Sequence, residues 1–186
     1  MHSLMPYRAI AAGLKGQWWL LQDNRAEAIP LLTRALEELH AQRHEMLNMD
    51  FTCDLAAALA DLGEHEKALT LTVNAIEQQQ RAGKFLHMPA LFRMKGLILA
   101  SRSEEDYSEA KASLLAAIDW AKRQSATLFE LMAATDLAEL LQERVPEGYR
   151  HLKEAFDRMP AGSAFPAYMR AAKLLNQFQS GAKAAG

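Results

Sequence analysis

Residues 55–75 read LAAALADLGEHEKALTLTVNA, two mainly apolar runs joined by a polar turn that begins at Gly63. Apolar residues in both runs recur three and four positions apart, which is the period of an amphipathic helix. Glycine readily takes the left-handed conformation that ends many helices, so the first helix is expected to stop at Gly63. The stretch therefore predicts a helical hairpin.

The same pattern recurs along the chain at nearly even intervals. Its anchor positions, spaced by 40, 42 and 38 residues, are Ala28, Ala68, Ala110 and Gly148. Four residues after the anchors stand Leu32, Thr72, Leu114 and Leu152, and seven after them stand Ala35, Ala75, Ala117 and Ala155. A repeat of this length predicts an array of helical hairpins, in which each unit buries its apolar face against its neighbours.

The apolar spacing and the helix-ending signals predict nine helices and no strands. The expected ranges are 4–22, 25–43, 47–62, 65–82, 86–101, 107–124, 127–143, 146–159 and 163–179. They form repeats over 4–43, 47–83, 86–125 and 127–160, then a capping helix over 163–179 and a flexible tail over 181–186. The chain of 186 residues suits one domain, over about 1–180. The predicted fold class is all-α, a right-handed solenoid of helical hairpins.

Small residues are expected where the two helices of each hairpin come closest. On the first helices these are Gly16, Ala56, Gly96 and Ala138. A missing or short side chain lets two helix axes approach to about 8–10 Å. The alanines of the second helices act in the same way, so leucine at Ala75 or Ala117 is expected to overpack the contact by about 1–3 kcal/mol.

The hairpin at residues 55–75 resembles a tetratricopeptide repeat. The resemblance rests on Leu55-Ala56, Leu59, Leu62-Gly63, Ala68 and Ala75. The repeats of this chain are nearer 40 residues than the usual 34, so their helices are longer. The chain also departs from the family pattern at Lys15 and Lys95, where leucine is usual.

A second resemblance covers about residues 84–178. The segments 91–100, 109–111, 116–121 and 130–138 are similar to the C-terminal repeat region of large bacterial signalling proteins. In those proteins a winged-helix or nucleotide-cyclase domain and an ATPase precede the repeats. The resemblance implies a sensory or regulatory region that binds a protein, a peptide or a small inducer in its concave groove. A free-standing scaffold and an accessory domain of a cyclase are the alternatives.

Composition argues against several other functions. The formal net charge is −2 and the basic residues are scattered, so direct binding of nucleic acid is not expected. No apolar run reaches the roughly 18 residues of a membrane span, and the first residues lack the pattern of a signal peptide. Cys53 is the only cysteine, which excludes an internal disulfide and suits a cytoplasmic protein.

The sequence contains no motif for catalysis. It has no glycine-rich phosphate loop, no Gly-x-Ser-x-Gly elbow and no His-Glu-x-x-His pair. His40 and His44 lie one helical turn apart, with Glu37 on the same face, a spacing that metal ligands can use. A histidine at a helix end also complements the helix dipole, and we favour that interpretation. No enzyme activity, metal or cofactor is therefore expected.

In a repeat array of this kind, the first helix of each hairpin lines the concave groove. The residues expected to face it are Gln17, Asp50, Cys53, Ala57, Arg93, Leu97, Thr135, Glu139 and Gln142. Arg93 is the best candidate for recognition, because a guanidinium can clamp a carboxylate bidentately. The alternative is an internal salt bridge to Asp50, Asp54 or a carboxylate within 127–143. Cys53 is either a groove thiol or, as we favour, a small buried residue.

The N-terminal helix is apolar on more than one face. Trp19 fits the hairpin contact, whereas Tyr7, Leu14 and Trp18 are expected at an interface. Terminal units of a repeat array need a polar outer face to stay soluble. This helix is therefore expected to pack against a preceding repeat or against a second copy of the chain, which would make a homodimer. The alternative is that the helix at 25–43 covers all of it.

Overall fold

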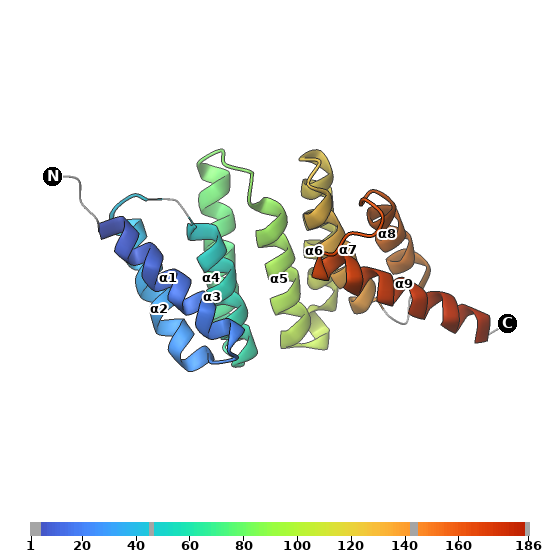
Figure 1. The fold of residues 1–186 in the computed structure, drawn as a ribbon, viewed down its shortest axis with the longest axis horizontal. Coiled ribbons are helices and arrows are strands. Elements are labelled where there is room, and N and C mark those ends of the chain that lie inside the picture. The colour runs from blue at the N-terminus through green and yellow to red at the C-terminus, as the bar shows by residue number, and fades with distance from the viewer. Residues whose placement is uncertain (1–4, 45–46, 142–144, 185–186) are drawn as a thin grey trace. The chain divides into compact units, whose positions relative to one another are not determined.

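The computed structural model describes residues 5–44, 47–141 and 145–184, and every regular element in these ranges is helical (Figure 1). The elements are α1 (Met5–Leu21), α2 (Arg25–Ala41), α3 (Asn48–Asp61), α4 (His65–Arg81), α5 (Met88–Arg102), η1 (Glu104–Asp106, a 3₁₀ turn), α6 (Tyr107–Arg123), α7 (Thr127–Leu140), α8 (Val145–Asp157) and α9 (Pro166–Ala184). The all-α class predicted from the sequence is confirmed. None of these helices combines the length and the apolar character needed to span a bilayer.

Only the end of the last helix departs from its predicted position by more than three residues. The helix α9 begins at Pro166, whose fixed backbone angle suits a first helical turn. It continues to Ala184, five residues beyond the predicted end of the capping helix at 179. One glycine inside a helix costs only about 1 kcal/mol, and the flanking alanines and lysine favour helix.

The predicted repeat register agrees with the pattern of burial. All four anchors are buried, as are the residues four and seven positions after them. The one polar side chain at these positions is that of Thr72, which stands where the other repeats have leucine and is fully buried. Its hydroxyl donates a 2.8 Å hydrogen bond to the carbonyl oxygen of Ala68, so no polar group is left without a partner there.

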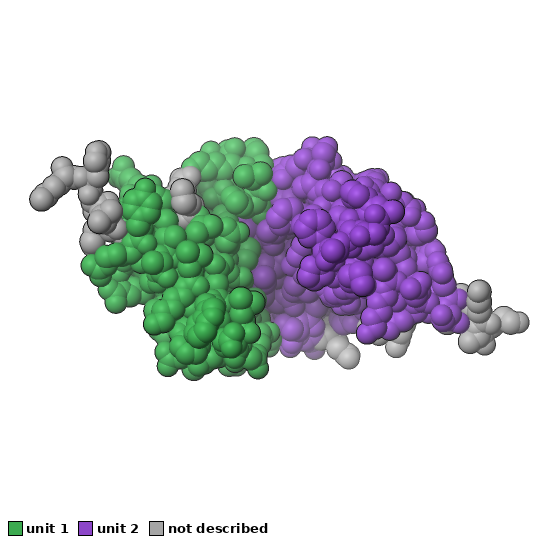
Figure 2. Space-filling view, in the orientation of Figure 1, with its two compact units in different colours: residues 1–87 green, residues 88–186 purple. Residues whose placement is uncertain are grey.

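The chain forms two compact units, unit 1 over residues 1–87 and unit 2 over residues 88–186 (Figure 2). In unit 1 each helix packs against the next, and α1 also contacts α3. Its core is built around Phe51, Leu32 and Leu39, which are fully buried. The single right-handed solenoid predicted from the sequence spans both units and stays a prediction.

Unit 2 is organised around α7. This helix packs against α5, α6, α8 and α9. Its residues are buried on nearly every side, including Leu131, Leu137 and the charged Asp136. Phe156 and Tyr168 stack with ring centroids 4.5 Å apart and join α8 to α9.

Glycines lie at close helix contacts, and Gly16 and Gly96 are two of the small residues predicted for such contacts. A Cβ atom on Gly16 would lie 2.8 Å from Leu32 Cγ, and one on Gly96 would lie 2.7 Å from Leu114 Cγ. In the last hairpin the glycine is on the second helix, where a Cβ on Gly148 would lie 3.0 Å from a backbone atom of α7. The two helices of a hairpin therefore approach closely at a glycine, which can lie on the first helix or on the second.

Five helices end with the same backbone motif. A residue in the left-handed conformation follows α1, α2, α3, α4 and α6, and the next amide donates a 2.9 Å hydrogen bond five residues back. This is the Schellman arrangement, which satisfies the last carbonyls of a helix. The left-handed residues are Asp23, Arg43, Gly63, Gly83 and Ser125. Only the two glycines had been recognisable as helix stops.

Candidate binding surfaces

Four of the predicted groove residues lie in unit 1, on α1 and α3. Gln17 Nε2 donates a 2.5 Å hydrogen bond to Asp54 Oδ2, which links the two helices. Asp50 is exposed, whereas Cys53 and Ala57 are half-buried. The structure thus brings Gln17 to the face of α3 that carries these residues.

The Asp54 carboxyl has a perturbed acidity. Burial raises the pKa of Asp54 above its ordinary value, and the negative charge of Asp50 acts in the same direction. The hydrogen bond from Gln17 acts in the opposite direction and does not outweigh them. The charged form of Asp54 is therefore disfavoured by its surroundings.

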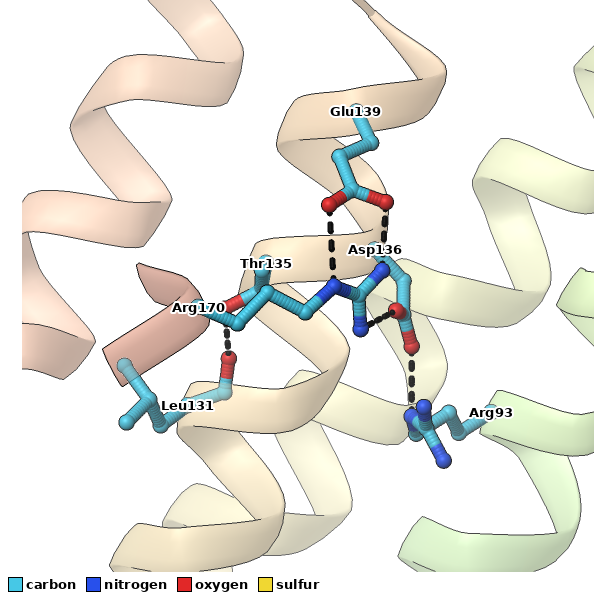
Figure 3. Close-up of polar contacts among 6 residues, drawn as sticks. All are labelled: Arg93, Leu131, Thr135, Asp136, Glu139 and Arg170. Carbon is cyan, nitrogen blue, oxygen red and sulfur yellow. Dashed lines mark hydrogen bonds and ion pairs between the residues drawn. The ribbon is translucent and has the colours of Figure 1, made fainter. Parts of the chain in front are cut away.

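Arg93 belongs to an ion-pair network inside unit 2 (Figure 3). Its Nε lies 2.5 Å from Asp136 Oδ2, and Arg170 Nη1 lies 2.8 Å from Asp136 Oδ1. Arg170 also donates a 2.9 Å hydrogen bond from Nε to Glu139. The Asp136 side chain is 0% exposed, so its charge depends on these two arginines. Two cations and two anions from α5, α7 and α9 thus balance one another.

This geometry corresponds to one of the two alternatives for Arg93, a salt bridge to a carboxylate within 127–143. Arg93 and Glu139 were predicted as site residues from the sequence, whereas Asp136 and Arg170 were not. A signal existed for Asp136, because a carboxylate inside an otherwise apolar helix needs a buried cation. No such signal exists for Arg170, which lies near the start of α9.

The other predicted groove residues of unit 2 have separate surroundings. Leu97 is half-buried on α5. Thr135 is buried, and its hydroxyl donates a 2.7 Å hydrogen bond to the carbonyl oxygen of Leu131. It also lines a small cavity of about 230 Å³ beside Arg170. Gln142 lies outside the described residues.

A larger cavity, of about 610 Å³, lies in unit 1 and is called here the α2–α4 cavity. It is lined by Leu36, Glu37, His40, Asn48, Met49, Thr52, Leu71, Asn74, Ala75, Gln78, Gln79, Lys84, Leu86 and His87. Most of these residues lie on α2, on α4 and on the first turns of α3. A volume of this size is typical of ligand pockets.

None of the predicted groove residues lines the α2–α4 cavity. The cavity uses Asn48 and Thr52 of α3, which are one turn apart. The predicted residues Asp50 and Cys53 point elsewhere, because successive residues turn by about 100° around a helix. Binding was predicted on the first helix of each hairpin, whereas most residues that line this cavity lie on the second helices or beside them.

Leucine at Ala75 was predicted to overpack a helix contact. Ala75 is buried and also lines the cavity, so the prediction of overpacking stays a prediction at this position. Ala117 is fully buried, and the predicted overpacking applies to that position.

The histidines considered as metal ligands lie at or near this cavity. Glu37 and His40 line it, and the carbonyl oxygen of His44 accepts a 2.9 Å hydrogen bond from Asn48 Nδ2. Within the described residues, no group of three or more His, Cys, Asp or Glu side chains is placed to hold a metal ion. His40 thus forms part of the wall of a cavity whose volume is typical of ligand pockets.

An apolar stripe runs along the outer face of α1. It is formed by Tyr7, Ala11, Leu14, Trp18 and Leu21, all of them exposed. Tyr7 is 62% exposed, Trp18 50% and Leu21 83%. The alternative expectation, that α2 covers all of α1, is therefore wrong, because this face of α1 is exposed. The Trp18 and Trp19 rings form an edge-type pair with their centroids 4.6 Å apart.

Comparison with known proteins adds no family to these observations. No family model matches the chain, and no curated protein sequence matches it either. The candidate surfaces rest on the geometry of this chain alone.

Proposed function

We propose that this protein is a non-enzymatic binding module that holds a helix of a partner protein on the α1 stripe. The observation that carries the proposal is the exposure of large apolar side chains along one helix face. Contiguous apolar patches on a soluble protein usually mark an interaction surface. Single exposed apolar residues need no such explanation, but these are aligned.

The spacing of the stripe matches a helical partner. Its residues are alternately four and three positions apart, which is the 3.5-residue period of a coiled-coil seam. A partner helix with the same period could insert its apolar side chains between Leu14, Trp18 and their neighbours. Aromatic residues such as Trp18 are frequent anchors in protein interfaces.

Charge indicates what kind of helix fits. Arg8 and Lys15 are exposed beside the stripe, seven residues apart, and neither has an ion-pair partner among the described residues. The sequence of α1 contains no Asp or Glu. A second copy of α1 would bring these cations together, whereas a partner helix with acidic flanks would neutralise them. We therefore favour an acidic amphipathic helix over the homodimer suggested by the sequence.

The resemblance to bacterial repeat regions extends the proposal by analogy. The partner would then be another part of a cytoplasmic transcriptional or signalling regulator, and binding would shift its activity between two states. A free-standing scaffold is the alternative. An immunoblot of the source cells separates the two, since a band well above 20.7 kDa supports a regulator and a band at that mass supports a scaffold.

The binding surface is tested with a designed helical peptide of three heptads, with leucine in its seam and glutamate on its flanks. We expect Leu14→Ala and Trp18→Ala to weaken its binding by about tenfold or more, measured by fluorescence anisotropy. Phe165→Ala is the matched control, because Phe165 is 56% exposed but lies in unit 2. The pair Arg8→Glu and Lys15→Glu should reverse the preference toward a peptide with lysine flanks.

Two outcomes contradict parts of the proposal. Self-association in light scattering that disappears in Trp18→Ala, with no peptide binding, would assign the stripe to a second copy. Absence of both peptide binding and self-association would remove the α1 stripe as a binding surface.

A further inference from the structure

The wall of the α2–α4 cavity that belongs to α4 carries a row of carboxamides. Asn74, Gln78 and Gln79 all line the cavity. Gln79 is only 9% exposed, and its side chain has no hydrogen-bond partner among the described residues. An amide on a cavity wall that bonds to nothing within the chain has its donor and its acceptor available to a ligand.

The spacing of the row suits a polypeptide main chain. Asn74 and Gln78 are one helical turn apart, which is about 6 Å along α4. Alternate residues of an extended chain are about 6.6 Å apart, so the two repeats nearly coincide. A carboxamide carries a donor and an acceptor side by side, and it can therefore pair with both the N–H and the C=O of a peptide.

The remaining lining supplies places for side chains. Leu36, Met49, Leu71 and Leu86 are apolar, and Ala75 leaves space beside them. Side chains of an extended peptide point alternately to two sides, so every second one can enter this apolar part. Methionine adapts to differently shaped neighbours, which suits a surface that accepts more than one apolar residue.

The α2 wall carries charge. Glu37 lines the cavity, is exposed and has no ion-pair partner among the described residues. A basic side chain of the ligand on this side would pair with it. His40 lies three residues after Glu37 on α2, also lines the cavity and offers a further polar contact.

We infer that the α2–α4 cavity binds an extended peptide. Its main chain pairs with the carboxamides of Asn74, Gln78 and Gln79, its alternate apolar side chains enter the cavity, and a basic residue faces Glu37. This site is separate from the α1 stripe, which takes a helix, and the inference does not depend on that proposal.

The test uses an array of capped hexapeptides with an apolar residue at every second position and lysine, glutamate or serine between. We expect members with lysine to bind the full chain most tightly, as measured by fluorescence anisotropy. The same peptides with N-methyl groups on alternate main-chain nitrogens lose their N–H donors. They should bind about tenfold or more weakly if the carboxamides read the main chain.

Variants locate the binding on the chain. Gln78→Leu and Asn74→Leu keep the size of the side chain but remove the amide, and each should weaken binding by about tenfold. Gln80→Leu is the matched control, because Gln80 is an exposed amide on α4 that does not line the cavity. Ala75→Leu places a larger side chain in the cavity and should abolish binding. A thermal melt of each variant serves to check that it folds.

Several results would overturn the inference. They are the absence of any binding peptide, equal binding of the N-methylated set, and equal loss in Gln78→Leu and Gln80→Leu. Binding of small apolar compounds in place of every peptide would assign the cavity to another ligand class. The acidic helical peptide used for the α1 stripe should not compete with the hexapeptides. Failure at one surface is thus distinguishable from failure at the other.

Discussion

Asp54 holds its carboxylate where burial penalises the negative charge. Because its pKa in the folded chain lies above the ordinary value, the folded state binds more protons than the unfolded state between those two values. Stability therefore falls as pH rises through that window, and the loss persists at neutral pH.

We expect Asp54→Asn to melt at a higher temperature than the original chain at pH 7. Asparagine still offers an oxygen to Gln17 but carries no charge that burial penalises. The difference should shrink when the melts are repeated below the ordinary pKa of an aspartate. Glu37→Gln serves as a control, because that side chain is exposed. A lower melting temperature for Asp54→Asn at pH 7 would show that the charge is stabilising.

Ser125 holds a left-handed backbone with φ at 54° after α6. Residues with a Cβ atom destabilise this conformation by about 1–2 kcal/mol relative to glycine. Ser125→Gly is therefore expected to raise the free energy of unfolding by about 1 kcal/mol, measured in urea.

The reverse change at the same motif is the control. Gly63→Ala should destabilise the chain by a similar amount, through the backbone alone, since an added Cβ there would meet nothing within 4 Å. Stabilisation by Gly63→Ala would contradict the explanation.

Individual residues show how far sequence reasoning reaches. Burial of the anchors and their partners was predictable, because helical periodicity alone decides which face turns inward. The partner of Arg93 was not predictable, because Asp136 lies 43 residues away and meets it only after α5 and α7 pack. The site residues were therefore chosen by type and face, without their partners.

At the scale of helices, Gly96 controls the distance between α5 and α6. Gly→Ala inside a helix normally stabilises by about 0.5–1 kcal/mol. Here the new Cβ would lie 2.7 Å from Leu114 Cγ and 3.1 Å from the carbonyl oxygen of Ala110. Gly96→Ala is thus expected to destabilise the chain by about 1–3 kcal/mol in chemical unfolding.

A double-mutant cycle checks the cause. Leu114→Ala removes the atom nearest to the new Cβ, so Gly96→Ala should be less harmful in that background. Equal effects in both backgrounds would locate the strain elsewhere.

Helix positions were well predicted because turn residues and apolar spacing are local signals. Proline and glycine at 160–162 predicted the break before the last helix. The helix start at Pro166 was missed by three residues, and the extension to Ala184 was missed because a small-residue tail was interpreted as flexible. The closest helix contacts followed from small residues, which sequence displays directly.

At the scale of the whole chain, the all-α class followed from periodicity, whereas the location of the α2–α4 cavity did not. That cavity is lined by α2, α4 and the first turns of α3, and both α2 and α4 pack against α3. Its position depends on how these three helices stack, which no single helix pattern encodes. Binding was therefore predicted on a different face of α3.

The central position of α7 leads to a prediction about hydrogen exchange. It contacts four other α-helices of unit 2, whereas α9 contacts only α7 and α8. Amides of residues 131–138 are expected to exchange most slowly in unit 2, because exposing them requires the whole unit to open. Exchange followed by mass spectrometry tests this. Equal protection along α9 would contradict it.

The order of helix contacts has a consequence for biosynthesis. Within each unit, α-helices that pack together are adjacent in the chain or separated by one helix. Little chain entropy is lost in closing such short connections, and proteins rich in local contacts fold within microseconds to milliseconds. A ribosome adds only about 5–20 residues per second, so the contacts between successive helices can form while the rest of the chain is still being synthesised.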